Sequence, residues 1–170
     1  MKKFVATGMI LMFTATVLAG CGNTENEAEK TSSAAAKTKE VSVSSGESLI
    51  IPVEDLTENA AFYPVNVDGT EMEVVALKDA DGTIRTAFNT CQICYDSGNG
   101  YYKQEGDKLV CRNCGNSFTM DQIGETAGGC NPWPILESDR TFEGSEIHIS
   151  YDFLKNSSEI FENWKGAYQS

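Results

Sequence analysis

The chain has 170 residues and a mass of 18.5 kDa, which is enough for one ordinary domain. Its formal net charge is -12 and its pI is ≈ 4.4. These values exclude nucleic acid as a partner, because binding to phosphates needs a basic face.

The first 20 residues have the pattern of a bacterial lipoprotein signal peptide. Lys2 and Lys3 form a short basic region, residues 4–17 are mostly apolar but short for a transmembrane span, and Leu18-Ala19-Gly20-Cys21 follows. The thiol of Cys21 would receive a diacylglyceryl group, and long acyl chains such as palmitate would hold the protein at the membrane. The alternative is an ordinary secretory signal with an incidental cysteine. We therefore expect a lipid anchor on Cys21, at the extracytoplasmic face of the cell membrane.

The next segment, residues 21–40, is rich in Glu, Lys, Ser, Thr and Ala and has almost no large apolar side chains. Such a composition cannot bury a core, so we interpret it as a disordered tether from the lipidated Cys21. A flexible tether would let the folded domain stand clear of the membrane.

Residues 41–155 are expected to form a mainly β, cysteine-rich domain. Short apolar or alternating runs are separated by turn residues such as Asp68-Gly69. Asp79 and Asp81 are interpreted as a hairpin turn rather than a calcium loop, because no glutamate follows at the twelfth position. We expect a small antiparallel sheet, a partly open barrel or a sandwich. Strands are predicted over residues 41–43, 49–53, 62–67, 71–77, 83–88, 101–104, 108–110 and 141–150.

The end of the chain, residues 156–170, is predicted to form a short amphipathic helix. It begins with an Asn-x-x-Glu pattern, and Ile160, Phe161, Trp164 and Tyr168 follow at helical spacing.

Five of the six cysteines lie between positions 91 and 130. Cys91-x-x-Cys94 and Cys111-x-x-Cys114-Gly115 have the spacing by which four thiolates surround one tetrahedral metal or a small cluster. Gly115 would let the second turn form without a clashing side chain. The sequence therefore predicts two cysteine knuckles that bind a metal through Cys91, Cys94, Cys111 and Cys114.

The fifth cysteine of this region, Cys130, follows Gly128-Gly129 and precedes two prolines that exclude a helix. It would be a cluster ligand, a disulfide partner or a redox-active thiol near the site. Four thiolates suit zinc, a single iron or an iron-sulfur cluster, and a closed zinc site needs no fifth thiolate. Two disulfides with one thiol left over remain the alternative to metal binding in an oxidising compartment.

Other residues contribute less to the prediction. His148, the only histidine, lies on an alternating strand and is expected to face solvent rather than a metal. There is neither a Gly-x-Ser-x-Gly motif nor a phosphate-binding loop, so nothing indicates an enzyme. A hydrophobic wall around the cysteines is expected from Tyr95, Tyr101, Tyr102, Phe118 and Trp133.

Several motifs together resemble the membrane iron-sulfur containing FtrD-like family, over roughly Val41 to Leu154. They are Ile84-Arg85-Thr86-Ala87-Phe88, Cys91-x-x-Cys94-Tyr95, Gly100-Tyr101-Tyr102-x-Gln104-Glu105-Gly106-Asp107, Val110-Cys111-x-Asn113-Cys114-Gly115 and Gly128-Gly129-Cys130-Asn131-Pro132. The resemblance implies an iron-sulfur cluster at Cys91, Cys94, Cys111 and Cys114, with Cys130 as an additional family position. It also implies a connection with bacterial iron uptake systems that include a permease.

Two functions follow as hypotheses. The first is a surface-anchored protein that binds an iron-sulfur cluster or iron and transfers electrons or handles iron, with an iron permease or a redox protein as its partner. The second is a zinc-ribbon module whose metal only holds the fold.

Overall fold

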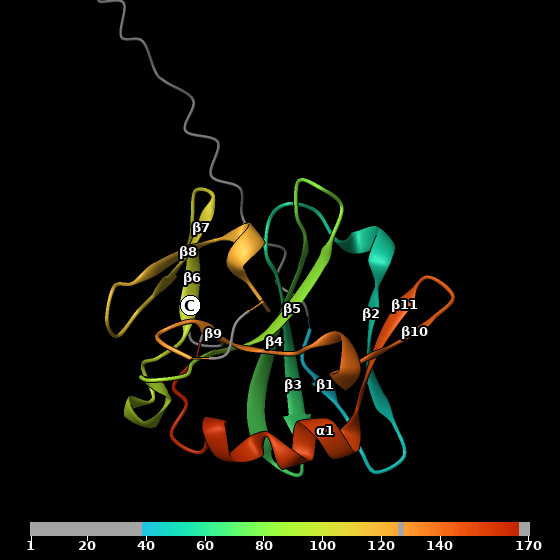
Figure 1. Ribbon diagram of the computed structural model, residues 1–170. Coiled ribbons are helices and arrows are strands. Elements are labelled where there is room, and N and C mark those ends of the chain that lie inside the picture. Colours follow the sequence, from blue (N-terminus) through green and yellow to red (C-terminus); the bar gives the residue numbers. More distant parts are fainter. Residues whose placement is uncertain (1–38, 126–127, 167–170) are drawn as a thin grey trace, which may run out of the picture. The chain divides into compact units, whose positions relative to one another are not determined.

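The computed structural model describes residues 39–125 and 128–166 (Figure 1). The predicted signal peptide, Cys21 and nearly all of the predicted tether lie outside these residues. Within the described ranges, no helix has the length and apolar character that crossing a membrane requires.

The central element is a five-stranded sheet in which β1 is parallel to β3 and the other neighbours are antiparallel. A tight turn at Asp68 and Gly69, with φ of 51° and 87°, joins its second and third strands, as expected for a two-residue hairpin. In sheet order the strands are β1 (Val41–Ser42), β3 (Ala61–Val67), β4 (Thr70–Lys78), β5 (Ile84–Cys91) and β9 (Pro132–Pro134).

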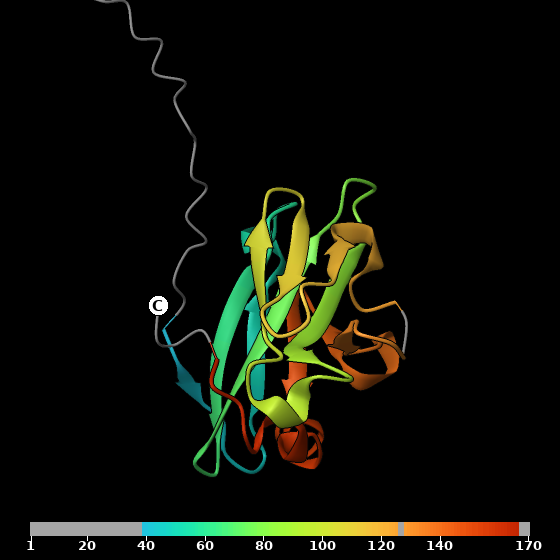
Figure 2. The same ribbon diagram turned by 90° about the vertical axis from the view of Figure 1, so that its left-hand side faces the viewer.

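Two further sheets flank the central one (Figures 1 and 2). One has the order β10 (Thr141–Glu143), β11 (Glu146–Ser150) and β2 (Ser48–Pro52). The other consists of β6 (Tyr102–Glu105), β7 (Lys108–Cys111) and β8 (Ser117–Thr119). Five short 3-10 helices are also present among the described residues: η1 (Val53–Asp55), η2 (Tyr95–Ser97), η3 (Met120–Gln122), η4 (Glu137–Asp139) and η5 (Ser158–Phe161).

The fold confirms the prediction of a mainly β protein, and it is built from several small sheets. Two details differ from the expected strands. The predicted strand at residues 141–150 is a hairpin of β10 and β11 that turns at Gly144. The runs at residues 41–43 and 49–53 do not pair with each other, because β1 joins β3 and β2 joins β11.

The C-terminal helix begins earlier than predicted. Helix α1 covers Tyr151–Asn156, and the hydroxyl of Ser150 caps it by accepting a hydrogen bond from the backbone N–H of Phe153 at 3.3 Å. Asn156, which we expected to start a helix, instead ends one, and η5 follows it. The prediction of a helix over residues 156–170 is therefore wrong in its bounds: the α-helix ends at Asn156, a 3-10 helix covers Ser158–Phe161, and residues 167–170 lie outside the described part of the chain.

The buried side chains form two clusters. The first lies among the central sheet, the β10-β11-β2 sheet and the C-terminal segment, and it includes Leu49, Ile51, Ile147 and Leu154. The second lies between β4 and β5 on one side and the β6-β7-β8 sheet on the other. Its buried members are Ala60, Val75, Leu77, Ala87, Cys91, Cys94, Tyr102, Leu109, Cys111, Met120 and Ile123.

Candidate metal centre

Four cysteine sulfurs meet at one end of the second cluster. The Sγ atoms of Cys91, Cys94, Cys114 and Cys130 all lie within 4.8 Å of one another. Metal–sulfur bonds of about 2.3 Å in a tetrahedron place the sulfurs roughly 3.8 Å apart. The four thiols therefore fit a metal centre after small side-chain movements.

The strands bring these thiols together from three distant segments. Cys91 ends β5 and is paired with Pro132 of β9, so the segment that holds Cys130 lies beside the first knuckle. Cys111 ends β7 and is paired with Tyr102 at the start of β6. The sheet pairing, rather than the local turns alone, thus positions the cysteines.

Cys111 is the fifth thiol of the centre. It is buried and lies outside the set of four mutually close sulfurs, but its side chain contacts that of Cys114. The structure therefore gathers three of the four predicted metal ligands with Cys130 and keeps the fourth beside Cys114. All five of these cysteines are free thiols, so none forms a disulfide with another.

Backbone N–H groups point at the sulfurs in both knuckles. The N–H of Cys94 donates to Cys91 Sγ at 3.4 Å. In the second knuckle, the N–H groups of Asn113 and Cys114 donate to the sulfur of Cys111. Gly115, with φ of 75°, closes this turn by donating to the carbonyl of Cys111 at 2.9 Å. Such bonds stabilise thiolate charge and tune a bound metal.

Gly100 supports the first knuckle. Its carbonyl accepts a hydrogen bond from the N–H of Cys91 at 2.6 Å. A Cβ at this position would lie 2.7 Å from the backbone carbonyl carbon and oxygen of Cys94. Only glycine can approach the knuckle this closely without displacing it.

The thiols differ in how readily they ionise. Burial raises the pKa of Cys94 to about 12 and that of Cys111 to about 11, although hydrogen bonds from Asn113 oppose both shifts. Burial also acts on Cys114, but the N–H of Asn116 and the neighbouring thiols outweigh it and lower the pKa of that group. Because a metal binds thiolates, its binding must release protons from the buried pair.

Side-chain amides connect the segments that hold the cysteines. Gln92 accepts from the N–H of Gly128 at 2.6 Å and donates to the carbonyl of Pro132 at 3.2 Å. Asn131 donates to the carbonyl of Gly128 at 2.8 Å. These bonds hold the loop around Cys130 against the first knuckle.

The second knuckle uses the same chemistry. The side chain of Asn113 is hydrogen-bonded to Cys94, and that of Asn116 to Cys130. Together Gln92, Asn113, Asn116 and Asn131 form what we call the amide collar. The sequence analysis did not predict it, since all of its bonds except that of Asn131 to Gly128 join residues far apart in the chain.

The predicted aromatic wall is confirmed in part. Tyr102 is buried among Cys91, Cys94 and Cys111, donates its hydroxyl to the carbonyl of Cys130, and packs edge-to-face on Phe118. Burial, with a contribution from Cys91, raises the pKa of Tyr102. Trp133 instead packs against the first cluster. The ring of Tyr95 packs edge-to-face on that of Trp133, with the two ring centroids 5.8 Å apart. Tyr101 is half-buried, and its backbone carbonyl accepts a hydrogen bond from the N–H of Arg112 at 2.8 Å.

A buried carboxyl lies behind the first knuckle. Glu73 is 3% exposed and accepts a hydrogen bond from the side-chain amide of Asn89 at 2.6 Å. Asn89 also accepts from the N–H of Tyr102 at 2.7 Å and lies two residues before Cys91. Burial raises the pKa of Glu73 to about 7, although the bond from Asn89 opposes the shift.

His148 lies away from this centre. On β11 it is paired with Ile50, and its imidazole is 3.5 Å from Glu146 and 3.9 Å from Glu143. Its side chain is 15% exposed, so it is more buried than the predicted solvent-facing position. Its exclusion from the predicted ligands agrees with this placement.

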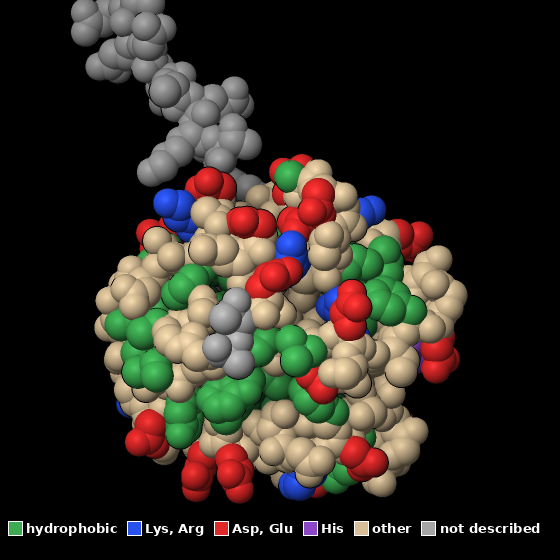
Figure 3. All heavy atoms as spheres, viewed as in Figure 1, with side chains coloured by type: hydrophobic (Ala, Val, Ile, Leu, Met, Phe, Trp, Pro, Cys, Tyr) green, Lys and Arg blue, Asp and Glu red, His purple; other side chains and the backbone are tan. Residues whose placement is uncertain are grey.

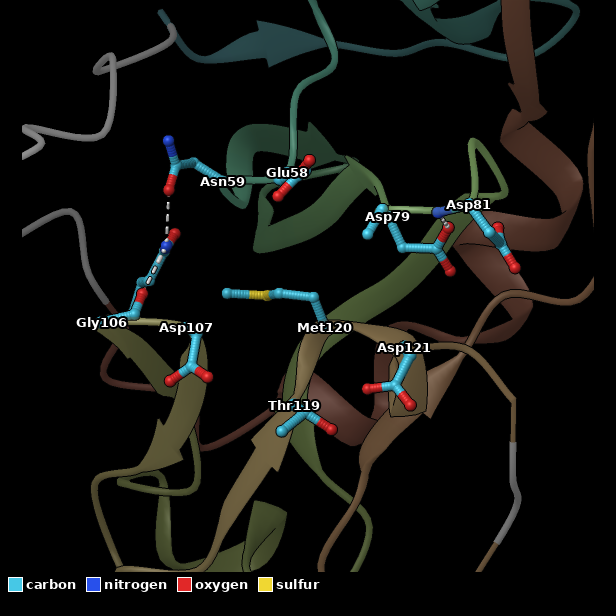
Figure 4. Close-up of a pocket in the computed structure, with 11 residues that line it drawn as sticks. Glu58, Asn59, Asp79, Asp81, Gly106, Asp107, Thr119, Met120 and Asp121 are labelled. Atoms are coloured by element: carbon cyan, nitrogen blue, oxygen red, sulfur yellow. Dashed lines mark hydrogen bonds between the residues drawn. The ribbon is translucent and has the colours of Figure 1, made fainter.

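A separate hollow of about 550 Å³ lies between the β4–β5 turn, the β6–β7 turn and η3 (Figure 4). The carboxylate of Asp79 is already engaged, because it accepts hydrogen bonds from Arg85 Nε at 2.6 Å and from the backbone N–H of Thr83 at 2.9 Å. This arrangement confirms the predicted hairpin turn. Within the described ranges, only the cysteine sulfurs bring three or more ligand atoms within 4.8 Å. The carboxylates that line the hollow belong to Glu58, Asp79, Asp81, Asp107 and Asp121.

Comparison with known families agrees with the centre. The family model described as "Membrane iron-sulfur containing protein FtrD-like" matches residues 53–161, which include all five clustered cysteines. The chain belongs to the FtrD-like family. Membership suggests an iron-related function for this FtrD-like protein, and its cluster of four close sulfurs could hold a metal ion.

Two other comparisons add little. No curated protein matches this FtrD-like chain. Among solved structures, the ferredoxin of carbazole 1,9a-dioxygenase from Nocardioides aromaticivorans IC177 is 21% identical, with a TM-score of 0.35, over 61% of this chain and 97% of that one.

Proposed function

We propose that this FtrD-like protein binds an iron-sulfur cluster or iron through its cysteine centre and transfers electrons or handles iron at the extracytoplasmic face of the membrane. One observation carries the proposal. Thiols from three separate segments converge, with four sulfurs within 4.8 Å of one another and a fifth in contact with them. Free thiols have no packing reason to gather in this way, whereas thiolates are the ligands of iron-sulfur clusters.

The chain's own residues would perform three tasks at the centre. Cys91, Cys94, Cys111 and Cys114, with Cys130 beside them, would bind the metal, which supplies the capacity for one-electron exchange. Backbone N–H groups and the side chains of Asn113 and Asn116 would donate to the sulfurs and stabilise their negative charge. Tyr102 and Phe118 would exclude water from the buried side.

The test is metal analysis of the full-length protein, purified without oxygen in detergent. We expect iron with acid-labile sulfide, and visible absorption that bleaches with dithionite. Iron without sulfide would indicate a mononuclear iron site. A protein with neither iron nor visible absorption would overturn the proposal.

A second candidate is a zinc-ribbon module whose metal only holds the fold. It is favoured by the mutual closeness of four sulfurs, which suits one tetrahedral ion. Stoichiometric zinc with no response to dithionite would establish this function instead.

The location and the connection with iron uptake are part of the same proposal. They are supported by the lipoprotein pattern that ends at Cys21 and by the family description. Wild type should incorporate labelled palmitate and stay in the membrane fraction, whereas a Cys21→Ala variant should incorporate none and should leave that fraction. Equal labelling of the two would contradict the anchor. An iron permease that copurifies with the protein would support the uptake role.

A further inference from the structure

The segments that surround the cysteine centre carry almost no charge. Residues 91–95, 111–119 and 128–136 contain one charged side chain, Arg112, whereas 22% of the whole chain is charged. The nearest carboxylates along the chain directly follow two of these segments, at Asp96 and Glu137. A chain with a net charge of -12 therefore presents a neutral zone around its thiols.

Much of this zone faces solvent. Ile93, at the tip of the first knuckle, is 64% exposed, the largest exposure among the exposed large hydrophobic side chains of the described residues. Asn113, Cys114, Gly115 and Asn116 are exposed at the second knuckle. We call these five residues the neutral face. On the side of the molecule in Figure 3, hydrophobic side chains gather near the middle, and acidic side chains lie mainly toward the top and bottom.

Electrostatics within the centre do not account for this composition. Thiolates would repel carboxylates, but they would equally attract lysine and arginine. The one cation of these segments, Arg112, pairs with Glu105 at 2.8 Å, and the collar is made of amides. Both acidic and basic side chains are therefore scarce where the centre meets solvent, and neutral side chains take these positions.

We propose that the neutral face is the docking surface for a protein electron carrier with an uncharged, apolar contact patch and a basic surround. The proposal rests on the proposed function, because the partner would exchange one electron with the bound metal. Cys114 is exposed within this face, so a docked partner would lie directly against a ligand of the centre.

Interface physics supports this partner. The cores of protein interfaces are depleted of charged residues, and redox encounters use small contact areas. Ile93 and the amides can lose water at low cost, whereas a carboxylate could not. The acidic remainder of the protein would attract a basic partner over a longer range and speed the encounter.

Cytochrome c, a basic haem protein, is a suitable probe. One electron passes from the reduced centre to the ferric haem, which becomes ferrous, and no proton or bond changes. The full-length protein is reduced with dithionite, freed of excess reductant, and mixed with the probe while the haem absorbance is followed. The compared variants are Ile93→Glu and Ile93→Lys, with Ile50→Glu and Ile50→Lys as matched controls on β2, where Ile50 is 47% exposed.

Docking and mere charge attraction give different results. If Ile93 lies in the contact, both of its variants should lower the second-order rate by about tenfold, because either charge must be desolvated. The Ile50 variants should stay within about twofold of wild type. The proposal is overturned if Ile93→Glu accelerates the reaction while Ile93→Lys slows it, or if both match their Ile50 counterparts.

Two checks keep the outcome clear. Each variant must retain the iron content and visible spectrum of wild type; otherwise Ser117→Glu and Ser117→Lys, at the exposed start of β8 beside the face, replace the Ile93 pair with the same expectation. A wild-type protein that dithionite cannot reduce overturns the proposed electron transfer and the docking with it. If the protein is reducible but these substitutions leave its second-order rate with cytochrome c unchanged, the docking alone is overturned.

Discussion

The two buried clusters of this FtrD-like protein are held together by different means. The first is aliphatic and aromatic, and fully buried side chains such as Leu49, Ile147 and Leu154 connect long strands with helix α1. The second includes Cys91, Cys94 and Cys111 among its buried members. Strands β8 and β9 at its cysteine end have three residues each. One cluster can form by apolar burial alone, whereas the other has three of the proposed metal ligands inside it.

This difference teaches where a metal would act on stability. Apolar side chains lose nothing when water leaves, but a buried thiol must either stay protonated or find a cation. Burial raises the pKa of both Cys94 and Cys111, so the thiols on their own resist the charge that binding requires. Metal binding should therefore be coupled to the folding of the second cluster only.

The largest expected effect is that of removing the metal. An anaerobic chelator should abolish hydrogen-exchange protection in β6 and β7 and leave it in β2 and β11, because thiolate-bound metal can contribute on the order of 10 kcal/mol to local folding. Cys91→Ser should act in the same direction. Mass spectrometry of exchanged peptides measures both. Equal loss of protection in both clusters, or none in either, would contradict the division.

The comparison of Cys111→Ser with Cys130→Ser refines this result. Cys130 lies in the set of four close sulfurs, whereas Cys111 lies only beside it. The variant that loses more metal identifies the stronger ligand of the two. Metal content and visible absorption are the measurements.

The next effect concerns the first cluster. Ile147→Ala removes a side chain that is 0% exposed and should cost about 2–5 kcal/mol of unfolding free energy. Metal content should not change, because Ile147 belongs to the other cluster. Ile50→Ala, on the paired strand but 47% exposed, is the control and should cost less than about 1 kcal/mol. Loss of metal in Ile147→Ala would show that the clusters are not independent.

Local patterns predicted the pieces of this fold better than their pairing. The Asp68-Gly69 turn signalled the β3–β4 hairpin, and the turn around Gly106 signalled β6–β7. The parallel pair β1–β3 and the pair β2–β11 depend on which apolar faces meet in three dimensions, and no short segment contains that information. The helix start was missed because Ser150 also fits the end of a strand, so its capping role was not recognised.

The same distinction applies to the cysteine centre. Cys-x-x-Cys spacing is a local property, and it predicted Cys91, Cys94 and Cys114 of the four close sulfurs, but it gave Cys111 where the structure has Cys130. The amide collar depends on bonds such as that from Gly128 to Gln92, which lie 36 positions apart. The residues around either position do not indicate such a bond. Gly100 had a signal, a glycine between a knuckle and a strand, but its close contact with Cys94 is visible only in the structure.

The buried carboxyl at the boundary of the second cluster gives a pH-dependent effect. Burial raises the pKa of Glu73 from the ordinary glutamate value of 4.5 to about 7, so the folded state holds its proton more tightly than the unfolded state does. Its stabilising effect is complete below about pH 4.5 and is lost as the pH rises through about 7. Glu73→Gln should therefore raise stability at pH 8 relative to wild type, by on the order of 3 kcal/mol, with little change at pH 4.

Denaturant unfolding of Glu73→Gln across this pH range measures the effect. Glu71→Gln is the matched control, because Glu71 lies on the same strand but is exposed. It should show no such dependence on pH. A Glu73→Gln protein that gains nothing at pH 8 would mean that the carboxylate is solvated or compensated in the native state.

The smallest effect on stability is expected from removing the ion pair between Arg112 and Glu105, which lies beside the neutral face. Arg112 and Glu105 are 43% and 56% exposed, so solvent screens their interaction even at 2.8 Å. Arg112→Ala should change the unfolding free energy by less than about 0.5 kcal/mol and leave the metal content intact. A double-mutant cycle with Glu105→Ala isolates the pair. A coupling above about 1 kcal/mol would mean that the second knuckle is held by charge, whereas a smaller value leaves amides and backbone bonds as its support.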